Sequence, residues 1–137
     1  MSEQSAGGKK ILIIDDEPNV VAYLETLLQD NGYATCGAAN GREGLEKMQS
    51  ENPDLVCLDI TMPEKSGIAF YREIKDDPEL KDTPVVVVTA VTGHGGDPKP
   101  FEQFLKSRRQ VPPPEAFFSK PIDREAFVAK IGELLGG

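Results

Sequence analysis

Residues 10–17, KILIIDDE, form an unbroken apolar run that ends on three acids. The run has no polar alternation, so the strand that it predicts would be buried on both faces, as in a parallel sheet covered by helices. The acids begin where this strand ends. In an open parallel sheet, functional groups gather at the carboxyl ends of the strands. The stretch therefore predicts an α/β fold and indicates the edge of the sheet at which a site should lie.

The same alternation of apolar runs and amphipathic stretches continues along the chain. Pro18 suits the first turn of a helix, Asn31–Gly32 ends that helix, and Asp123 caps the last one. We predict strands over residues 10–15, 33–38, 54–59, 84–89 and 116–119, and helices over 17–31, 41–50, 66–75 and 123–135. Successive β–α units predict a doubly wound, five-stranded parallel sheet with the flavodoxin-like order 2-1-3-4-5 and helices on both faces.

The length and the net charge of the chain limit the functions that it can have. The 137 residues suffice for one domain, which we expect over residues 10–137 after a flexible tail over 1–9. The net charge of −8 argues against nucleic acid and against an anionic membrane surface as partners. No apolar run is long enough to span a membrane, and the start of the chain lacks the pattern of a signal peptide, so a cytoplasmic location is expected.

The two cysteines, Cys36 and Cys57, belong to no CxxC pair and to no cluster with metal-ligand spacing. In the expected strand order, another strand lies between the two strands that carry them. Those two strands are then roughly twice 4.8 Å apart. A disulfide needs closer Cα atoms, so the cysteines should be unpaired, which fits a reducing compartment.

Polar residues recur at the expected strand ends. Asp15 and Asp16 follow the first strand and Asp59 ends the third, while Thr89 and Lys120 follow from the fourth and fifth. Three carboxylates in one small site repel one another, so a cation is expected among them, and oxygen ligands of this kind favour Mg²⁺. A lysine and a hydroxyl beside them suit the oxygens of a phosphoryl group held on or near a carboxylate.

These residues stand in four motifs: IIDDEP at 13–18, LDITMP at 58–63 with Gly67 after it, VVVTA at 86–90 and FFSKP at 117–121. Together and in this order, they resemble the receiver domain of bacterial two-component response regulators. The resemblance covers about residues 10–135. Each motif alone is weak, whereas four in order at strand ends are specific.

The resemblance implies a role for each matched residue. Asp59 would accept a phosphoryl group from the phosphohistidine of a sensor histidine kinase, and the domain would pass the signal on to a downstream protein. It would not turn over external substrates. Asp16, Asp59 and the backbone carbonyl of Thr61 would bind Mg²⁺ directly, and Asp15 would act on it mainly through water. Thr89 and Lys120 would contact the phosphoryl oxygens, Phe117 would be the switch aromatic that follows Thr89, and the Lys120–Pro121 bond would be cis.

Two features depart from the family. Residues 92–115 are longer than usual and contain a glycine-rich turn, a possible helix over 101–110 and three prolines at 112–114. This segment is either a remodelled binding element or a surface insertion. In addition, the resemblance places Thr61 and Val91 at the positions that tune dephosphorylation, and neither offers an amide or a carboxylate to orient an attacking water molecule. We therefore expect slow self-dephosphorylation.

Three other functions remain open at this point. A receiver-like module could bind partners without phosphorylation, although it would not need the complete set of acids. An aspartyl phosphohydrolase of the haloacid dehalogenase kind would need a second acid two residues after its nucleophile, where Thr61 stands. A flavodoxin would bind the phosphate of FMN in its first loop, where residues 15–17 would repel it.

Overall fold

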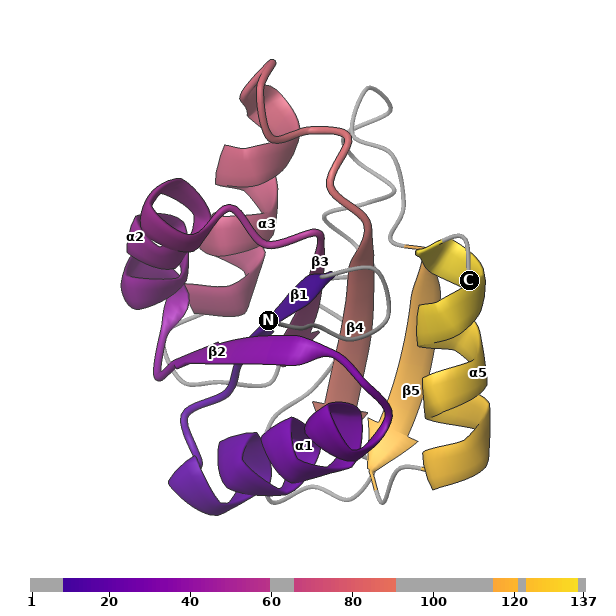
Figure 1. Ribbon diagram of the computed structural model, residues 1–137. Coiled ribbons are helices and arrows are strands. Elements are labelled where there is room, and N and C mark those ends of the chain that lie inside the picture. Colours follow the sequence, from indigo (N-terminus) through magenta and orange to yellow (C-terminus); the bar gives the residue numbers. More distant parts are fainter. Residues whose placement is uncertain (1–8, 60–65, 91–114, 121–122, 136–137) are drawn as a thin grey trace.

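Five parallel strands form a single sheet in the order β2-β1-β3-β4-β5, which confirms the predicted topology (Figure 1). The computed structural model describes residues 9–59, 66–90, 115–120 and 123–135. The strands are β1 (Lys10–Ile14), β2 (Ala34–Ala38), β3 (Leu55–Asp59), β4 (Val85–Ala90) and β5 (Ala116–Lys120).

Helices cover both faces of the sheet (Figure 1). Helices α1 (Pro18–Asp30) and α5 (Arg124–Leu134) lie on one face, and α2 (Gly41–Glu51) and α3 (Ser66–Asp76) lie on the other. Successive side chains of a strand point to opposite faces. Ile11 and Ile13 accordingly pack in the core layer under α1 and α5, whereas Leu12 and Ile14 pack in the layer under α2 and α3.

The element boundaries follow local chemistry. The first helix ends at Asn31, and Gly32 then takes a positive φ of 96°. The backbone N–H groups of Gly32 and Tyr33 donate to the carbonyls of Gln29 and Leu28, which is the Schellman arrangement. No predicted boundary of these strands and helices differs from the observed one by more than one residue. The predicted helix over 101–110 lies outside the described residues.

The cysteines are free and buried, as expected. Cys36 lies in the core layer under α2 and α3, whereas Cys57 lies in the layer under α1 and α5. Strand β1 separates their strands, and their side chains occupy opposite faces, so they cannot form a disulfide.

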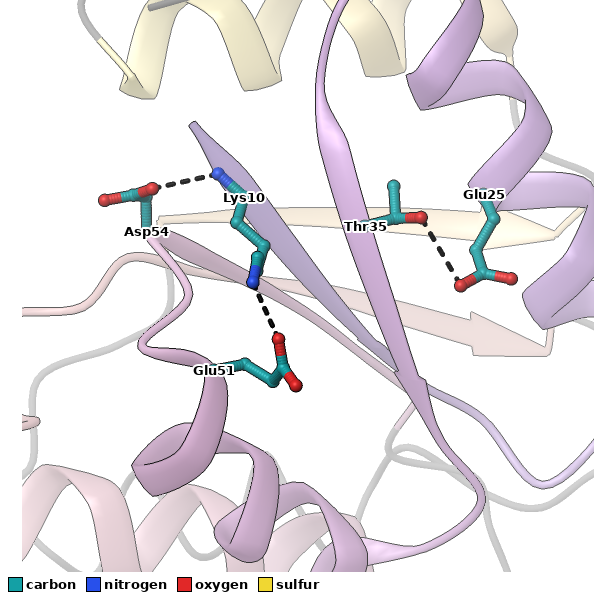
Figure 2. Close-up of polar contacts among 5 residues, drawn as sticks. All are labelled: Lys10, Glu25, Thr35, Glu51 and Asp54. Atoms are coloured by element: carbon teal, nitrogen blue, oxygen red, sulfur yellow. Dashed lines mark hydrogen bonds and ion pairs between the residues drawn. The ribbon is translucent and has the colours of Figure 1, made fainter. Parts of the chain in front are cut away.

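Lys10 fastens the amino end of β1 to two neighbouring elements (Figure 2). Its Nζ lies 2.6 Å from Oε1 of Glu51 at the end of α2, and its backbone N–H donates to Oδ2 of Asp54, just before β3, at 2.9 Å. The hydrogen bond to Glu51 raises the pKa of Lys10 and lowers that of Glu51. These contacts hold β1 and β3 in register, so that their carboxyl ends finish together at the opposite edge.

Candidate functional site

Three carboxylates meet at the carboxyl edge of the sheet, as the sequence predicted. Ile14 pairs with Leu58, so Asp15 and Asp59 follow directly on neighbouring strands. Oxygen atoms of Asp15, Asp16 and Asp59 all lie within 4.8 Å of one another. Asp15 is 2% exposed and Asp59 is 3% exposed, whereas Asp16 is open to solvent. Two buried carboxylates and an exposed one therefore share one small volume.

The turn after β1 positions Asp15. Its backbone N–H donates to the carbonyl of Ala38 at 3.1 Å, which extends the pairing of β1 with β2 by one residue. Its Oδ1 accepts the N–H of Glu17 at 2.9 Å, a local bond that aspartate often makes two residues on. Pro18 then starts α1 without needing a hydrogen-bond acceptor. The sequence Asp-Asp-Glu-Pro thus forms a short turn that directs its first carboxylate inward.

The donor set fits a hard divalent cation. All three groups present carboxylate oxygens, which are the ligands that Mg²⁺ prefers. Their mutual repulsion in a largely buried place also favours a cation among them. In the part of the chain that the structure describes, this is the one group of three such side chains with that spacing.

The backbone brings Thr89 and Lys120 to the same edge. Asp59 pairs with Val88, so Thr89 lies one residue beyond it on the adjacent strand. Ala90 pairs with Lys120, which ends β5. Phe117 pairs with Val87, deeper in the same strand pair. The strand register therefore places the backbone of Thr89 and Lys120 at the edge that carries Asp59. The side chains of Thr89, Phe117 and Lys120 lie outside what the structure describes, so their roles stay predictions.

Several predicted features fall on residues without a description. Thr61, Val91 and Pro121 are among them, as are residues 1–8 and residues 91–114, which contain nearly all of the atypical segment. Glu115, the last residue of that segment, is described. Its backbone N–H donates to the carbonyl of Val85 at 2.9 Å, and its Oε1 accepts the N–H of Val85 at 2.7 Å.

Glu43, which lines a cleft with Asp15 and Asp16, was not among the predicted site residues. Asn40 caps α2 by accepting the N–H of Glu43 at 2.9 Å, and Oε1 of Glu43 accepts the N–H of Ala39 at 2.8 Å. Asn40 and Glu43 have the spacing of a capping box, although Glu43 bonds the N–H of the residue before the cap. The sequence Asn-x-x-Glu was therefore a usable signal. The arrangement fixes the turn from β2 into α2, which lies next to Asp15 across a shared cleft.

Comparison with known proteins shows what this arrangement resembles. The response regulator receiver domain family matches residues 11–132. The polar-differentiation response regulator DivK of Brucella anthropi is 33% identical over 128 residues, which cover 93% of this chain and 97% of that protein. The match is thus to a domain of two-component signalling, and not to a class of turnover enzymes.

Solved structures share the fold as well. The signal receiver domain of a histidine kinase from Syntrophus aciditrophicus has a TM-score of 0.78 at 30% identity, covering 95% of this chain and 92% of that one. The chemotaxis protein CheY4 of Vibrio cholerae has a TM-score of 0.76 at 26% identity, covering 93% and 98%. No helix among the described residues is both long enough and apolar enough to cross a membrane.

Proposed function

Because this chain belongs to the response regulator receiver family, we propose that it is a signalling switch that Asp59 operates. In this proposal Asp59 accepts a phosphoryl group from the phosphohistidine of a sensor histidine kinase. The resulting acyl phosphate changes the surface that a downstream protein binds. The observation that carries the proposal is the convergence of Asp15, Asp16 and Asp59 within 4.8 Å at the carboxyl edge of the sheet.

The transfer is a single displacement at phosphorus. A carboxylate oxygen of Asp59 forms the new P–O bond while the P–N bond to the donor's imidazole breaks. The imidazole nitrogen keeps the electron pair of that bond and takes up a proton. Asp59 is the last residue of β3 and is 3% exposed, so the sheet positions it at this edge for attack on the donor.

Asp15, Asp16 and Asp59, with the backbone carbonyl of Thr61, would hold Mg²⁺ at this edge. When bound, Mg²⁺ would offset the negative charge of the carboxylates and of the incoming phosphoryl oxygens. Asp15 contributes through its fixed orientation, because its Oδ1 accepts the N–H of Glu17. Asp16 is exposed and can move toward a ligand without disturbing the core.

Thr89 and Lys120 would couple phosphorylation of Asp59 to a conformational change at this edge of the sheet. A phosphoryl group adds charge and acceptor oxygens at one point. A hydroxyl at Thr89 and an ammonium at Lys120 can bind those oxygens only when they are present, so phosphorylation favours one arrangement of this edge over another. Phe117, on the strand next to Thr89, would follow that rearrangement. The register of β4 with β5 supports this assignment.

Phosphorylation by a small-molecule donor tests the proposal. Incubation with phosphoramidate and Mg²⁺ should place one hydroxylamine-labile phosphate on each wild-type chain and none on the Asp59→Asn variant. An Asp30→Asn variant is a matched control, because Asp30 is an exposed acid at the far end of α1. It should label like the wild type.

Three results would count against the switch. Labelling that persists in Asp59→Asn would place the phosphate elsewhere. Repeated turnover of a phosphate ester would favour a phosphohydrolase. Failure to bind Mg²⁺ or to accept phosphate would favour a module that binds partners without phosphorylation.

The same labelled protein tests the lifetime of the phosphorylated state. Thr61 and Val91 offer neither an amide nor a carboxylate to orient an attacking water, so the acyl phosphate should persist well beyond seconds. We expect phosphorylation to require only the single domain over residues 10–137. The unpaired cysteines fit a reducing compartment such as the cytoplasm.

A further inference from the structure

A cleft of about 370 Å³ opens beside the acidic cluster. It lies between the first turns of α1, the carboxyl end of β2 and the start of α2. Asp15 and Asp16 line it, so the cleft is continuous with the site proposed for phosphorylation. Its volume is at the small end of the range for ligand sites, which excludes a large cofactor.

The cleft combines an apolar wall with an acidic rim. Two further carboxylates, those of Glu25 and Glu43, join the aspartates in its lining, and none of the described residues that line it is basic. The remaining lining residues are small or apolar: Pro18, Val21, Ala22, Gly37, Ala38 and Ala39. Gly37 allows α1 to pack closely on β2 at this wall, because a Cβ there would lie 2.8 Å from Cγ1 of Val21.

Both glutamates accept hydrogen bonds from neutral donors, and Glu43 also lies in the first turn of α2, where the helix dipole favours a negative charge. Glu43 accepts the N–H of Ala39. Glu25 accepts the hydroxyl of Thr35 at 3.4 Å (Figure 2), and that hydroxyl in turn accepts the amide of Gln29 at 2.8 Å. Neither glutamate makes an ion pair with any lysine or arginine in the described ranges.

This combination selects one kind of ligand. Apolar walls favour a hydrocarbon stem, and carboxylates on the rim favour a cationic head. Arginine and lysine side chains have both parts, because their methylene stems bury against apolar surface while their charged heads reach polar groups. An anionic or neutral group of the same size would leave the rim carboxylates without a partner.

We propose that this cleft receives a basic side chain of the protein that donates the phosphoryl group. The inference rests on the proposed function, since it assigns a partner contact to the same site. A donor that brings phosphorus to Asp59 comes close to Asp15 and Asp16, because oxygen atoms of all three lie within 4.8 Å of one another, and these two aspartates also line the cleft. A lysine or arginine on the donor would then enter the cleft beside them, and Glu25 and Glu43 would help to select the donor.

The charge preference can be measured by amide chemical shifts of the whole chain in saturating Mg²⁺. N-acetyl-argininamide should shift the amides of Gly37, Ala38 and Ala39 saturably, whereas N-acetyl-citrullinamide, a neutral analogue of the same shape, should not. The double variant Glu25→Gln/Glu43→Gln should bind the arginine probe about tenfold more weakly. Glu46→Gln is the matched control, because Glu46 is an exposed acid on α2 outside the cleft.

Phosphotransfer extends the test to a protein donor. A phosphorylated sensor kinase, chosen by screening for transfer to the wild type, should transfer about tenfold more slowly to the double variant than to Glu46→Gln. Equal rates for the two variants would overturn the inference, as would equal shifts from the citrulline probe. Displacement of the arginine probe by spermidine, with no slowing of transfer, would assign the cleft to a small cation instead. If phosphoramidate fails to label wild-type Asp59, the proposed function itself fails, which is a separate outcome.

Discussion

Asp16 differs from the two aspartates beside it in its exposure, although all three lie within 4.8 Å of one another. Asp15 and Asp59 are part of the folded interior, and Asp15 also organises the turn into α1 through Glu17. Asp16 contributes its charge to the cluster from the solvent side. Its substitution therefore separates the electrostatics of the cluster from its packing.

Asp16→Asn should stabilise the protein without Mg²⁺ and weaken its response to Mg²⁺. Asparagine has nearly the same shape, so the main change is the loss of one of three repelling charges, worth about 1 kcal/mol at a solvent-exposed position. Fewer ligand charges also lower the affinity for Mg²⁺, and with it the stabilisation by ligand binding. Urea unfolding with and without Mg²⁺ measures both effects. An Asp16→Asn variant that loses stability without Mg²⁺, or keeps the wild-type response to it, would contradict the repulsion argument.

Lys75 is a buried charged residue outside the acidic cluster. It is 8% exposed, and its Nζ donates to the backbone carbonyls of Lys81 and Thr83, each at 3.0 Å. The ammonium also lies 5.6 Å from the centre of the Tyr71 ring. Burial lowers the pKa of Lys75, and the nearby carboxylate of Glu115 opposes that shift. The lysine thus ties the end of α3 to the turn that leads into β4.

Lys75→Met should lower the free energy of unfolding by about 1–3 kcal/mol. Methionine retains an apolar stem in the same place, but two carbonyls of the turn lose their donor, and unsatisfied groups of this kind cost about that much. Lys81→Met is the control, because the side chain of Lys81 is exposed. Chemical denaturation should give a clearly lower free energy of unfolding for Lys75→Met than for Lys81→Met. Equal stability would mean that water replaces the ammonium at both carbonyls.

At the scale of elements, the packing of α2 depends on a glycine. Gly44 is buried on the face of α2 that meets β1 and α3. A Cβ at this position would lie 2.5 Å from Cδ1 of Ile14 and 3.0 Å from Cε1 of Phe70. The helix could keep its present distance from the sheet only if both side chains moved. Helix α2 also supplies Glu43, so its position bears on the cleft.

Gly44→Ala should therefore destabilise the fold, although alanine is the better helix former. The gain in helix propensity is about 1 kcal/mol, whereas overpacking a core contact costs about 1–3 kcal/mol. We expect a net loss of about 1 kcal/mol and altered amide shifts along α2. Ser50→Ala, on the exposed side of the same helix, should be neutral or slightly stabilising. A melting temperature of Gly44→Ala above that of the wild type would contradict this expectation. It would show that the side chains of Ile14 and Phe70 can move aside at little cost in free energy.

For the whole molecule, the sequence was sufficient to predict the order of the strands and the edge that carries the acids. Apolar runs without alternation implied a sheet covered on both faces, and the residues after Ile14 and at Asp59 marked its carboxyl ends. The convergence of three carboxylates followed from topology alone. Strand pairing is long-range, yet a doubly wound sheet has few alternative orders once the units are counted.

The sequence was insufficient wherever contacts depend on backbone groups from a distant segment. Lys75 looks like any exposed lysine of an amphipathic helix, because its partners are the carbonyls of residues 81 and 83 and carry no side-chain signal. The cleft at Glu25 and Glu43 arises from the distance between two helices and a strand end, which periodicity does not specify. The spacing of Asn40 and Glu43 did carry a local signal, since a capping box depends on neighbours only.

The reactivity of the two cysteines depends on whether their strand lies at the edge or in the centre of the sheet. Cys57 lies on β3, which pairs with strands on both sides, whereas Cys36 lies on β2, the edge strand, where it pairs with Leu12 alone. Cys57 is 1% exposed and Cys36 is 9% exposed, and burial raises the pKa of both thiols. Their reactivity should therefore be limited by how often each strand opens.

In single-cysteine variants, Cys36 in the Cys57→Ala protein should react with a thiol reagent at least about tenfold faster than Cys57 in the Cys36→Ala protein. Edge strands open by local fluctuations, whereas a central strand is released only when the whole sheet unfolds. The rate at Cys57 should consequently follow the global free energy of unfolding as urea is added, and the rate at Cys36 should depend on urea much less. Equal rates with the same urea dependence would mean that β2 opens only with the entire domain. A faster Cys57 would be incompatible with a central β3.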